Sequence, residues 1–218
     1  KPKCIVITFE GFAWERIVFA TAKEVCPNIK CIGYQHAAIF ESQHSMFSNL
    51  PSSFNPDFVL TSGQVNKKIL QEKFEKSQTA IRMLGSPRAS MFDTDLKHLN
   101  FLNRSVCLVL PEGSLSECNI LFEFSLECAK KMPEVDFIWR LHPLIDFESV
   151  IKRNSKLSRL TKNITLSTKS LDEDISISSF ALYRGSTAII SAISRGVVPI
   201  YLTQKEDLFS LDPLFRYT

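Results

Sequence analysis

The stretch YRGSTAIISAISRGVVPIYL, residues 183–202, decides the fold class. A strand-like end leads into a short polar turn, then into an apolar segment of helical length, and after a glycine into a second strand-like run. That glycine, Gly196, stands where a helix ends and a left-handed cap is expected. The stretch therefore predicts a β–α–β unit, whose crossover connection makes its two strands parallel.

The same alternation of short apolar runs and helical patterns extends along the rest of the chain. Strands are expected at 4–9, 30–35, 58–62, 80–84, 105–110, 136–141, 163–167, 180–183 and 197–202, and helices at 14–25, 65–74, 119–131 and 186–195. Strands that alternate with helices indicate a largely parallel sheet covered by helices on both faces. The predicted fold class is α/β.

Composition limits the kinds of partner. The 218 residues are 44% apolar, which suffices for one large or two modest domains. A net charge of only +3 gives no reason to expect a nucleic-acid partner, and peripheral membrane association stays open. No apolar run approaches the ~20 residues of a membrane span, so we expect a cytoplasmic protein. Six cysteines without metal-ligand spacing favour reduced core thiols over a zinc site or disulfides.

The segment SPRASMFDTDLKHLN, residues 86–100, is expected to connect two domains, because it has no clear period and carries a proline and mixed charges. The block before it reads as the later half of one α/β domain, and the block after it as most of another. We therefore expect domains at 1–95 and 101–218. Since the chain opens directly on a core strand without an initiator methionine, the first domain is expected to be incomplete.

The turn RGST, residues 184–187, lies where a ligand is expected. In an open α/β sheet the ligand crevice lies beyond the carboxyl ends of the strands, and Gly185 forms such a corner. Ser186 and Thr187 are expected to cap the next helix, whose first N–H groups and positive dipole end attract phosphate or carboxylate. Arg184 is expected to reach the same anion with its guanidinium.

A purely structural interpretation of this turn stays open. In it, Ser186 is only a cap and Arg184 is paired with an acid such as Asp172 or Asp174. No acidic pair suited to a divalent metal stands at a strand end, and residues 172–174 are expected to form a solvated loop. No metal is therefore expected.

A second candidate is WRLHPL, residues 139–144, at the exit of another strand. Because Pro143 disfavours helical backbone at the residue before it, His142 is presented from an extended loop, and Arg140 lies at the same exit. Near neutral pH the imidazole of His142 can donate to a phosphate oxygen. A structural histidine is the alternative.

A third candidate is LPEGSLSE, residues 110–117, between a strand and a helix. Ser114 and Glu117 fit a capping box, which is the structural interpretation. The functional alternative places the Gly113 backbone against a ligand phosphate. The motif is not a P-loop, because the GK[ST] ending is absent.

In the first block, Glu10 and His36 follow two strands and are expected to converge from adjacent strands. Either is a candidate general base, and a structural role is the alternative for each. The long polar and aromatic segment 36–56 is expected to be a functional or mobile loop.

Six segments in order resemble the two-domain GT-B class of nucleotide-sugar glycosyltransferases, and within it bacterial surface-polysaccharide biosynthesis proteins. They are TFEGFAWER, GYQHAAIF, PDFVLTSG, LGSPR, RLHP and RGSTAIISAISRGVVPIYL. The resemblance implies two Rossmann-like domains, with residues 1–95 on the acceptor side and residues 101–218 binding the donor. No further cofactor is implied beyond the nucleotide-sugar substrate.

The HP dipeptide with a later Ser/Thr helix start is also similar to sialyltransferase, polysialyltransferase and polyol-phosphate transferase families, which use cytidine nucleotides. This similarity implies that His142, Ser186 and Thr187 contact the donor phosphate, with Arg184 as an added counter-charge. The predicted function is metal-independent transfer of a sugar from a CMP- or UDP-linked donor to a surface glycan. The alternatives are a nucleotide-sugar epimerase of the same fold and a catalytically inactive nucleotide-binding or assembly subunit.

Overall fold

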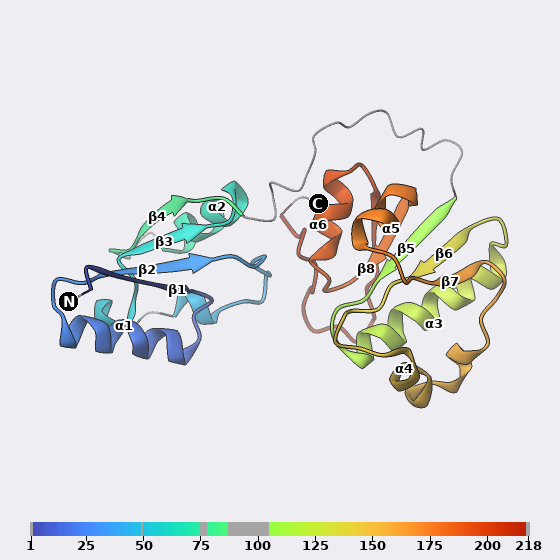
Figure 1. Cartoon of the computed structure of the whole chain (residues 1–218), viewed down its shortest axis with the longest axis horizontal. Helices are drawn as coiled ribbons and strands as arrows, with labels where there is room; N and C mark the ends of the chain where they lie inside the picture. Colours follow the sequence, from blue (N-terminus) through green and yellow to red (C-terminus); the bar gives the residue numbers. More distant parts are fainter. Residues whose placement is uncertain (1, 49, 75–77, 87–104, 217–218) are drawn as a thin grey trace. The chain divides into compact units, whose positions relative to one another are not determined.

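The computed structural model describes residues 2–48, 50–74, 78–86 and 105–216, and the chain divides into two compact units, residues 1–93 and 94–218 (Figure 1). Beyond Ser86, the predicted connection at 86–100 lies outside the described residues. Each unit contains one parallel sheet with its helices, so the α/β fold class is confirmed.

The first unit is a four-stranded sheet in the order β1-β2-β3-β4, and all three neighbouring pairs are parallel. Its elements are β1 (Cys4–Thr8), α1 (Ala13–Val25), β2 (Lys30–Gln35), β3 (Phe58–Thr61), α2 (Gln64–Lys73) and β4 (Ala80–Met83), with short 3-10 turns at Ser45–Phe47 and Ser52–Phe54. The carboxyl ends of all four strands therefore meet at one edge of the sheet.

Only one face of this sheet is well buried. Its strands follow one another in chain order, and right-handed crossovers between successive neighbours place α1 and α2 on the same face. Phe19, Cys31 and Val59 are fully buried there, whereas Val6, on the other face, is 56% exposed. The expectation that helices cover both faces is therefore wrong for the described part of this unit, because every connection winds in the same direction.

The second unit is a five-stranded parallel sheet in the order β7-β6-β5-β8-β9. Its elements are β5 (Val106–Leu110), α3 (Leu115–Lys131), β6 (Asp136–Trp139), α4 (Phe147–Arg153), a 3-10 turn (Ser155–Ser158), β7 (Ile164–Leu166), α5 (Leu171–Ile177), β8 (Phe180–Tyr183), α6 (Ala188–Ser194) and β9 (Val198–Tyr201). The chain winds outward from β5 in one direction, then returns and winds outward in the other, which is the doubly wound arrangement.

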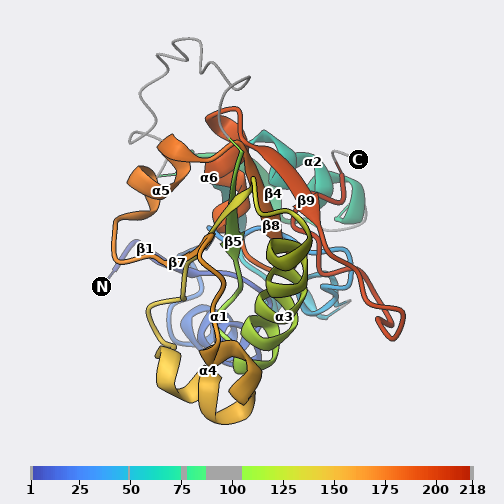
Figure 2. The same ribbon diagram turned by 90° about the vertical axis from the view of Figure 1, so that its right-hand side faces the viewer.

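Two separate apolar clusters lie on the two faces of the second sheet. One contains Phe122 of α3 and Trp139 of β6, whose rings stack with centroids 4.3 Å apart. The other contains Ile175 of α5 and Ile189 of α6. Figure 2 shows α3 and α4 on one side of the strands and α5 and α6 on the other. Here both faces are covered, as expected for a parallel sheet.

Three local features of the second unit refine the expectations. Helix α3 begins at Leu115, one turn earlier than expected, because Ser114 accepts a hydrogen bond from the backbone N–H of Glu117 and caps it. Pro199 is tolerated because β9 is an edge strand. Gly196 has φ of +81°, in the left-handed region expected after α6.

The cysteines are free thiols, as expected, although they are not all in the core. Cys31, Cys107 and Cys118 are buried, whereas Cys4 is exposed. Burial raises the pKa of Cys118 to about 11. The buried thiols are therefore protonated near neutral pH and serve as small apolar side chains.

Candidate functional site

The second unit has one topological switch point, between β5 and β8, because the chain winds away from these neighbouring strands in opposite directions. Open α/β sheets bind ligands beyond the carboxyl ends of such strands. The loops that leave this point are PEGS, residues 111–114, and RGST, residues 184–187. Sheet topology thus brings together two of the three segments that the sequence singled out.

Two glycines bring the loops of this edge into close contact. A methyl group on Gly185 would lie 2.5 Å from Oε2 of Glu112, and one on Gly113 would lie 3.0 Å from Nδ1 of His142. The ring of His142 therefore packs against the backbone of Gly113, and the carboxylate of Glu112 packs against that of Gly185. Three strand ends, those of β5, β6 and β8, contribute to one cluster.

His142 has a defined orientation in this cluster. Its Nδ1 accepts a hydrogen bond from the backbone N–H of Leu144 at 3.3 Å. When Nδ1 accepts, the proton of the neutral ring lies on Nε2, which is left to donate. The half-buried imidazole is thus a candidate donor to an anion.

Arg184 is committed to two carboxylates. Its Nε lies 3.0 Å from Oε1 of Glu117, and its Nη2 lies 2.9 Å from Oδ1 of Asp207. Its side chain is only 4% exposed. The structural interpretation, in which Arg184 is paired with an acid, is therefore correct. The acids suggested for it are wrong, because Asp172 pairs with Arg195 and Asp174 pairs with Arg140. The guanidinium is therefore neutralised within the protein and not presented to solvent.

Glu117 is buried beside this arginine and does not complete the expected capping box. Its carboxylate faces Arg184 and not the backbone of Ser114. Burial raises the pKa of Glu117, the Arg184 guanidinium opposes that rise, and Glu112 and Asp207 add to it. The acidic side chains around Arg184 therefore outnumber its single positive charge.

Arg140 is also bound within the protein. Its Nη1 donates to Oδ2 of Asp174 at 2.7 Å and to the carbonyl of Lys169 at 2.6 Å. Asp174 is 1% exposed and also accepts from Ser167. The expectation of a solvated loop at 172–174 is wrong, because these residues form the first turn of α5, capped by Ser170.

The RGST turn does not cap α6 with a side chain. Thr187 is the N-cap residue, but its backbone is helical with φ of −71° and ψ of −10°, and its hydroxyl makes no capping bond. A capping side chain needs extended backbone at that position. The backbone N–H of Ile190 instead donates to the carbonyl of Thr187 at 3.1 Å. The capping prediction for Ser186 and Thr187 is therefore wrong.

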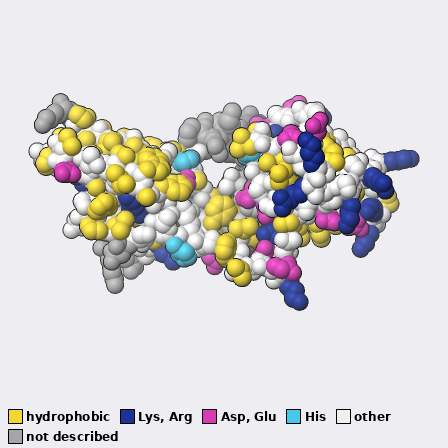
Figure 3. Space-filling view, turned by 90° about the horizontal axis from the view of Figure 1, so that it is seen from below, with side chains coloured by type: hydrophobic (Ala, Val, Ile, Leu, Met, Phe, Trp, Pro, Cys, Tyr) yellow, Lys and Arg dark blue, Asp and Glu magenta, His cyan; other side chains and the backbone are white. Residues whose placement is uncertain are grey.

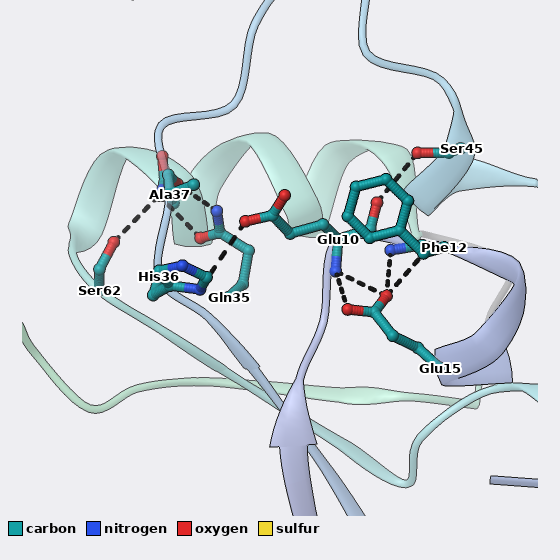
Figure 4. A network of polar contacts seen from close by, with 10 residues as sticks. Glu10, Phe12, Glu15, Gln35, His36, Ala37, Ser45 and Ser62 are labelled. Carbon is teal, nitrogen blue, oxygen red and sulfur yellow. Dashed lines mark hydrogen bonds and ion pairs between the residues drawn. The ribbon is translucent and has the colours of Figure 1, made fainter. Parts of the chain in front are cut away.

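The first unit places Glu10 and His36 side by side. Nδ1 of His36 lies 3.7 Å from Oε1 of Glu10, and Figure 4 shows the two side chains pointing toward each other from the ends of neighbouring strands. The side chain of His36 is 43% exposed and that of Glu10 is 22% exposed. Their convergence is as expected, and both remain accessible to a ligand.

The backbone that carries Glu10 is held by a buried carboxylate that the sequence did not single out for this role. Glu15 accepts hydrogen bonds from the backbone N–H groups of Glu10, Gly11 and Phe12 at 2.8–3.2 Å. These bonds close the turn between β1 and α1 (Figure 4). The usual capping signature has Ser or Thr at the N-cap, whereas Phe12 stands there, so the motif gave no signal.

The later part of the segment 36–56 is hydrogen-bonded to α1. The guanidinium of Arg16 donates to the carbonyls of Ser45 and Met46 at 3.1 and 2.8 Å and to the side chain of Asn55. The hydroxyl of Ser45 also donates to the carbonyl of Glu10 at 2.9 Å. These bonds join the segment to the strand end that carries Glu10.

Polar contacts also hold the strand end that carries His36. Asn66 of α2 donates to the side chain of Gln35 at 2.7 Å and to the carbonyl of Ala37 at 2.9 Å. It also donates to the hydroxyl of Ser62 at 3.1 Å. The two strand ends are therefore positioned by separate sets of hydrogen bonds, most of them partly buried.

The described residues contain no cluster of three or more His, Cys, Asp or Glu side chains placed to bind a metal ion. No helix within the described ranges is both long and apolar enough to cross a bilayer.

Known proteins resemble this chain in structure and not in sequence. No protein-family model and no curated protein sequence matches it. A chain of the GtfA/B complex matches with a TM-score of 0.58 and 14% identity, over 93% of this chain and 42% of that chain. The pneumococcal O-GlcNAc transferase GtfA, solved with UDP and GlcNAc, matches with a TM-score of 0.50 and 16% identity, over 92% of this chain and 42% of that chain.

The chain shares its fold with the matched parts of these two chains. At these identities the likeness concerns the fold alone. The chain spans about two fifths of the length of the chains that it matches.

Proposed function

We propose that this chain belongs to a glycosyltransferase and that its second unit binds the nucleotide-sugar donor. The observation that carries the proposal is the convergence of the β5, β6 and β8 ends at the switch point, with His142 against Gly113 and Glu112 against Gly185. Because a Cβ at either glycine would crowd these side chains, the two glycines favour close approach of the loops at the place where this architecture binds nucleotides.

In this proposal the donor phosphate lies beside His142 and the backbone of residues 185–187. The Nε2–H of His142 donates to a phosphate oxygen and stabilises the charge that develops on the leaving nucleotide. Arg184 and Arg140 hold the surrounding loops through their carboxylate partners. The fold neighbour solved with UDP and GlcNAc makes a UDP-linked donor the first choice, with a CMP-linked donor as the alternative.

The acceptor is assigned to the first unit. Glu10 or His36 would remove the proton from an acceptor hydroxyl, because both are accessible and they lie 3.7 Å apart. Glu15 and Arg16 would keep Glu10 in place through the backbone bonds described above. The acceptor is proposed to be a surface polysaccharide or another glycan.

Titration with UDP, UDP-GlcNAc, CMP, CDP and GDP tests the donor site. We expect one nucleotide family to bind. Replacing His142 by Ala should weaken this binding about 10- to 100-fold, because a hydrogen bond to a charged group contributes about 1.5–3 kcal/mol. Gly113→Ala should act in the same direction by pushing the imidazole aside. Isothermal titration calorimetry measures both effects, and His44→Ala, an exposed histidine of the first unit, is the control. Absence of binding by every nucleotide would contradict the proposal.

A catalytically inactive subunit is the second candidate. It is favoured by the carboxylates that already pair with Arg184 and Arg140, which leave these two guanidinium groups neutralised within the protein. Such a subunit would bind a nucleotide without releasing it from UDP-GlcNAc or CMP-sialic acid. An epimerase would instead convert the donor sugar without any acceptor. Nucleotide release and sugar analysis by chromatography separate the three activities.

A further inference from the structure

Residues 203–209 form a loop that leaves the carboxyl end of β9, beside the RGST turn, because β8 and β9 are parallel neighbours in the sheet. We call this segment the β9 loop. Its turn is closed by its own atoms, since the backbone N–H of Asp207 donates to the carbonyl of Gln204 at 3.1 Å. The backbone N–H of Gln204 in turn donates to Oδ2 of Asp207 at 2.8 Å. In Figure 2 the red chain that follows β9 projects from the unit as a narrow loop.

The β9 loop has little contact with the rest of the second unit. Among its residues, all of which the structure describes, Asp207 is half-buried and the other six are exposed. Leu208 is 94% exposed and Phe209 is 57% exposed, so neither side chain anchors the loop in the core. The polar contact from the loop to the described part of the unit is the bond from Nη2 of Arg184 to Oδ1 of Asp207, at 2.9 Å.

The ends of the β9 loop are held independently of this contact. The backbone N–H of Leu202 donates to the carbonyl of Tyr183 at 2.9 Å, which extends the β8–β9 ladder. The backbone N–H of Leu211 donates to the hydroxyl of Tyr201 at 2.9 Å. The loop is therefore fixed at both ends, and between them one ion pair holds it against the protein.

Arg184 has more hydrogen-bonding capacity than its two carboxylates use. A guanidinium carries five N–H donors. Glu117 contacts Nε and Asp207 contacts Nη2, whereas Nη1 is buried without a hydrogen-bond partner. Asp207 offers the guanidinium one oxygen, because its other oxygen is bonded to Gln204. A phosphate group binds a guanidinium through two parallel bonds, so it would satisfy Arg184 more completely than Asp207 does.

We propose that the β9 loop is a latch on an anion site, in which Asp207 holds the place of a phosphate group of the ligand. The phosphate displaces Asp207 and takes Arg184 as its counter-charge, while Glu117 stays in contact with Nε. This inference rests on the proposed function for the identity of the ligand, because Arg184 belongs to the RGST turn of the donor site. A ligand that needs the open loop binds with an apparent affinity reduced by the fraction of molecules in which the loop is closed.

Asp207→Asn tests the latch, because it removes the competing charge and keeps the size of the side chain. We expect this variant to bind its phosphate ligand about 5- to 30-fold more tightly than the unaltered chain, since closure of the loop no longer competes. Isothermal titration calorimetry with UDP, CDP, GDP and inorganic pyrophosphate measures the effect. The pyrophosphate titration separates recognition of phosphate from recognition of a nucleoside.

Glu206→Gln is the matched control. Glu206 is the exposed neighbour of Asp207 in the same loop and makes no contact with Arg184 among the described residues. Acidic as well as basic side chains lie on the face of the second unit seen in Figure 3, so the control measures the general effect of removing one negative charge. At about 0.15 M salt we expect Glu206→Gln to change the affinity by less than about twofold, because exposed charges are screened. Thermal unfolding checks that both variants are folded.

Limited trypsin digestion of the unaltered chain tests the latch without any substitution. Cleavage after Lys205, in the β9 loop, should become at least about threefold faster when UDP or pyrophosphate saturates the site, because release of Asp207 frees the loop. Cleavage after Lys162, an exposed residue of the same unit outside the loop, is the internal reference and should not change. A rate after Lys205 that falls or stays constant on ligand binding would overturn the latch.

The titrations separate failure of the latch from failure of the proposed function. Nucleotide binding that Asp207→Asn does not strengthen would overturn the latch and leave the proposed function standing. Equal strengthening by Glu206→Gln would also overturn it, because the effect would then be one of net charge. If no nucleotide binds either chain, the proposed function is contradicted. The latch is then supported by tighter pyrophosphate binding in Asp207→Asn and overturned by its absence.

Discussion

Replacing Arg184 by Ala is expected to lower the free energy of unfolding of the second unit by about 3–5 kcal/mol. The substitution leaves the Glu117 carboxylate buried without its cation and frees Asp207 from the same guanidinium. A buried charge without a partner is costly, whereas the intact pair is close to neutral for stability, so the loss reflects the orphaned carboxylate. Urea unfolding of the two proteins measures the difference.

Arg195→Ala is the matched control. Arg195 also pairs with a carboxylate, that of Asp172 at 2.7 Å, but this carboxylate is 58% exposed. Exposed pairs contribute about 0–1 kcal/mol, so this substitution should have little effect. Equal losses for the two variants would contradict the interpretation that burial makes Arg184 important.

The loss in Arg184→Ala should also depend on pH. Burial already raises the pKa of Glu117, and Arg184 opposes the rise, so removing the arginine raises that pKa further. A carboxyl whose folded pKa lies above its unfolded value contributes stability that is present at low pH and lost as pH rises through the folded pKa. The variant should therefore lose more stability at pH 8 than at pH 5. A loss that is the same at both pH values would indicate that Glu117 is not the orphaned group.

Gly11→Ala is expected to lower the free energy of unfolding of the first unit by about 2–4 kcal/mol, through backbone strain and overpacking. Gly11 has φ of +85°, and a methyl group there would lie 2.3 Å from the backbone nitrogen of Met46. Because Met46 is also held by Arg16, it has little room to retreat. Urea unfolding measures the effect.

Alanine substitutions at two other glycines distinguish backbone strain from overpacking. Gly85 has φ of +104° with nothing within 4 Å of the added methyl group, so Gly85→Ala should show the strain alone, about 1–2 kcal/mol. Gly63 has open space and extended backbone, with φ of −168°, so Gly63→Ala should change stability by less than about 0.5 kcal/mol. Similar losses of unfolding free energy for Gly11→Ala and Gly85→Ala would show that Met46 moves aside and adds no overpacking.

The strands were predictable because each is a short apolar run, and a parallel sheet buries such runs. The nine predicted strands correspond to β1–β9, and α1, α2, α3 and α6 were expected within a few residues of their observed ends. Helices α4 and α5 were not predicted, whereas α6, which also has seven residues, could be recognised between two strand-like runs and before Gly196. Their signal lay in the capping residues Asp146 and Ser170.

The candidate site was predictable only in part. The strand ends that carry Glu10 and His36 could be placed together, because neighbouring parallel strands end at the same edge. The partners of Arg184 could not, because Glu117 is 67 positions away in the chain and reaches the guanidinium only after α3 packs on the sheet. The burial of Arg16 could not be predicted either, because its partners Ser45 and Met46 lie about 30 positions away in the chain.

The amino-acid sequence by itself determined the parallel α/β class, the positions of most strands and the segments that leave the carboxyl ends of those strands. These follow from local periodicity and turn chemistry, which act over a few residues. The tertiary structure decided which charges are neutralised within the protein and which loops meet at the switch point. Those outcomes depend on contacts between segments that are distant in the chain. A buried charge must have a partner, and only the folded chain brings that partner close.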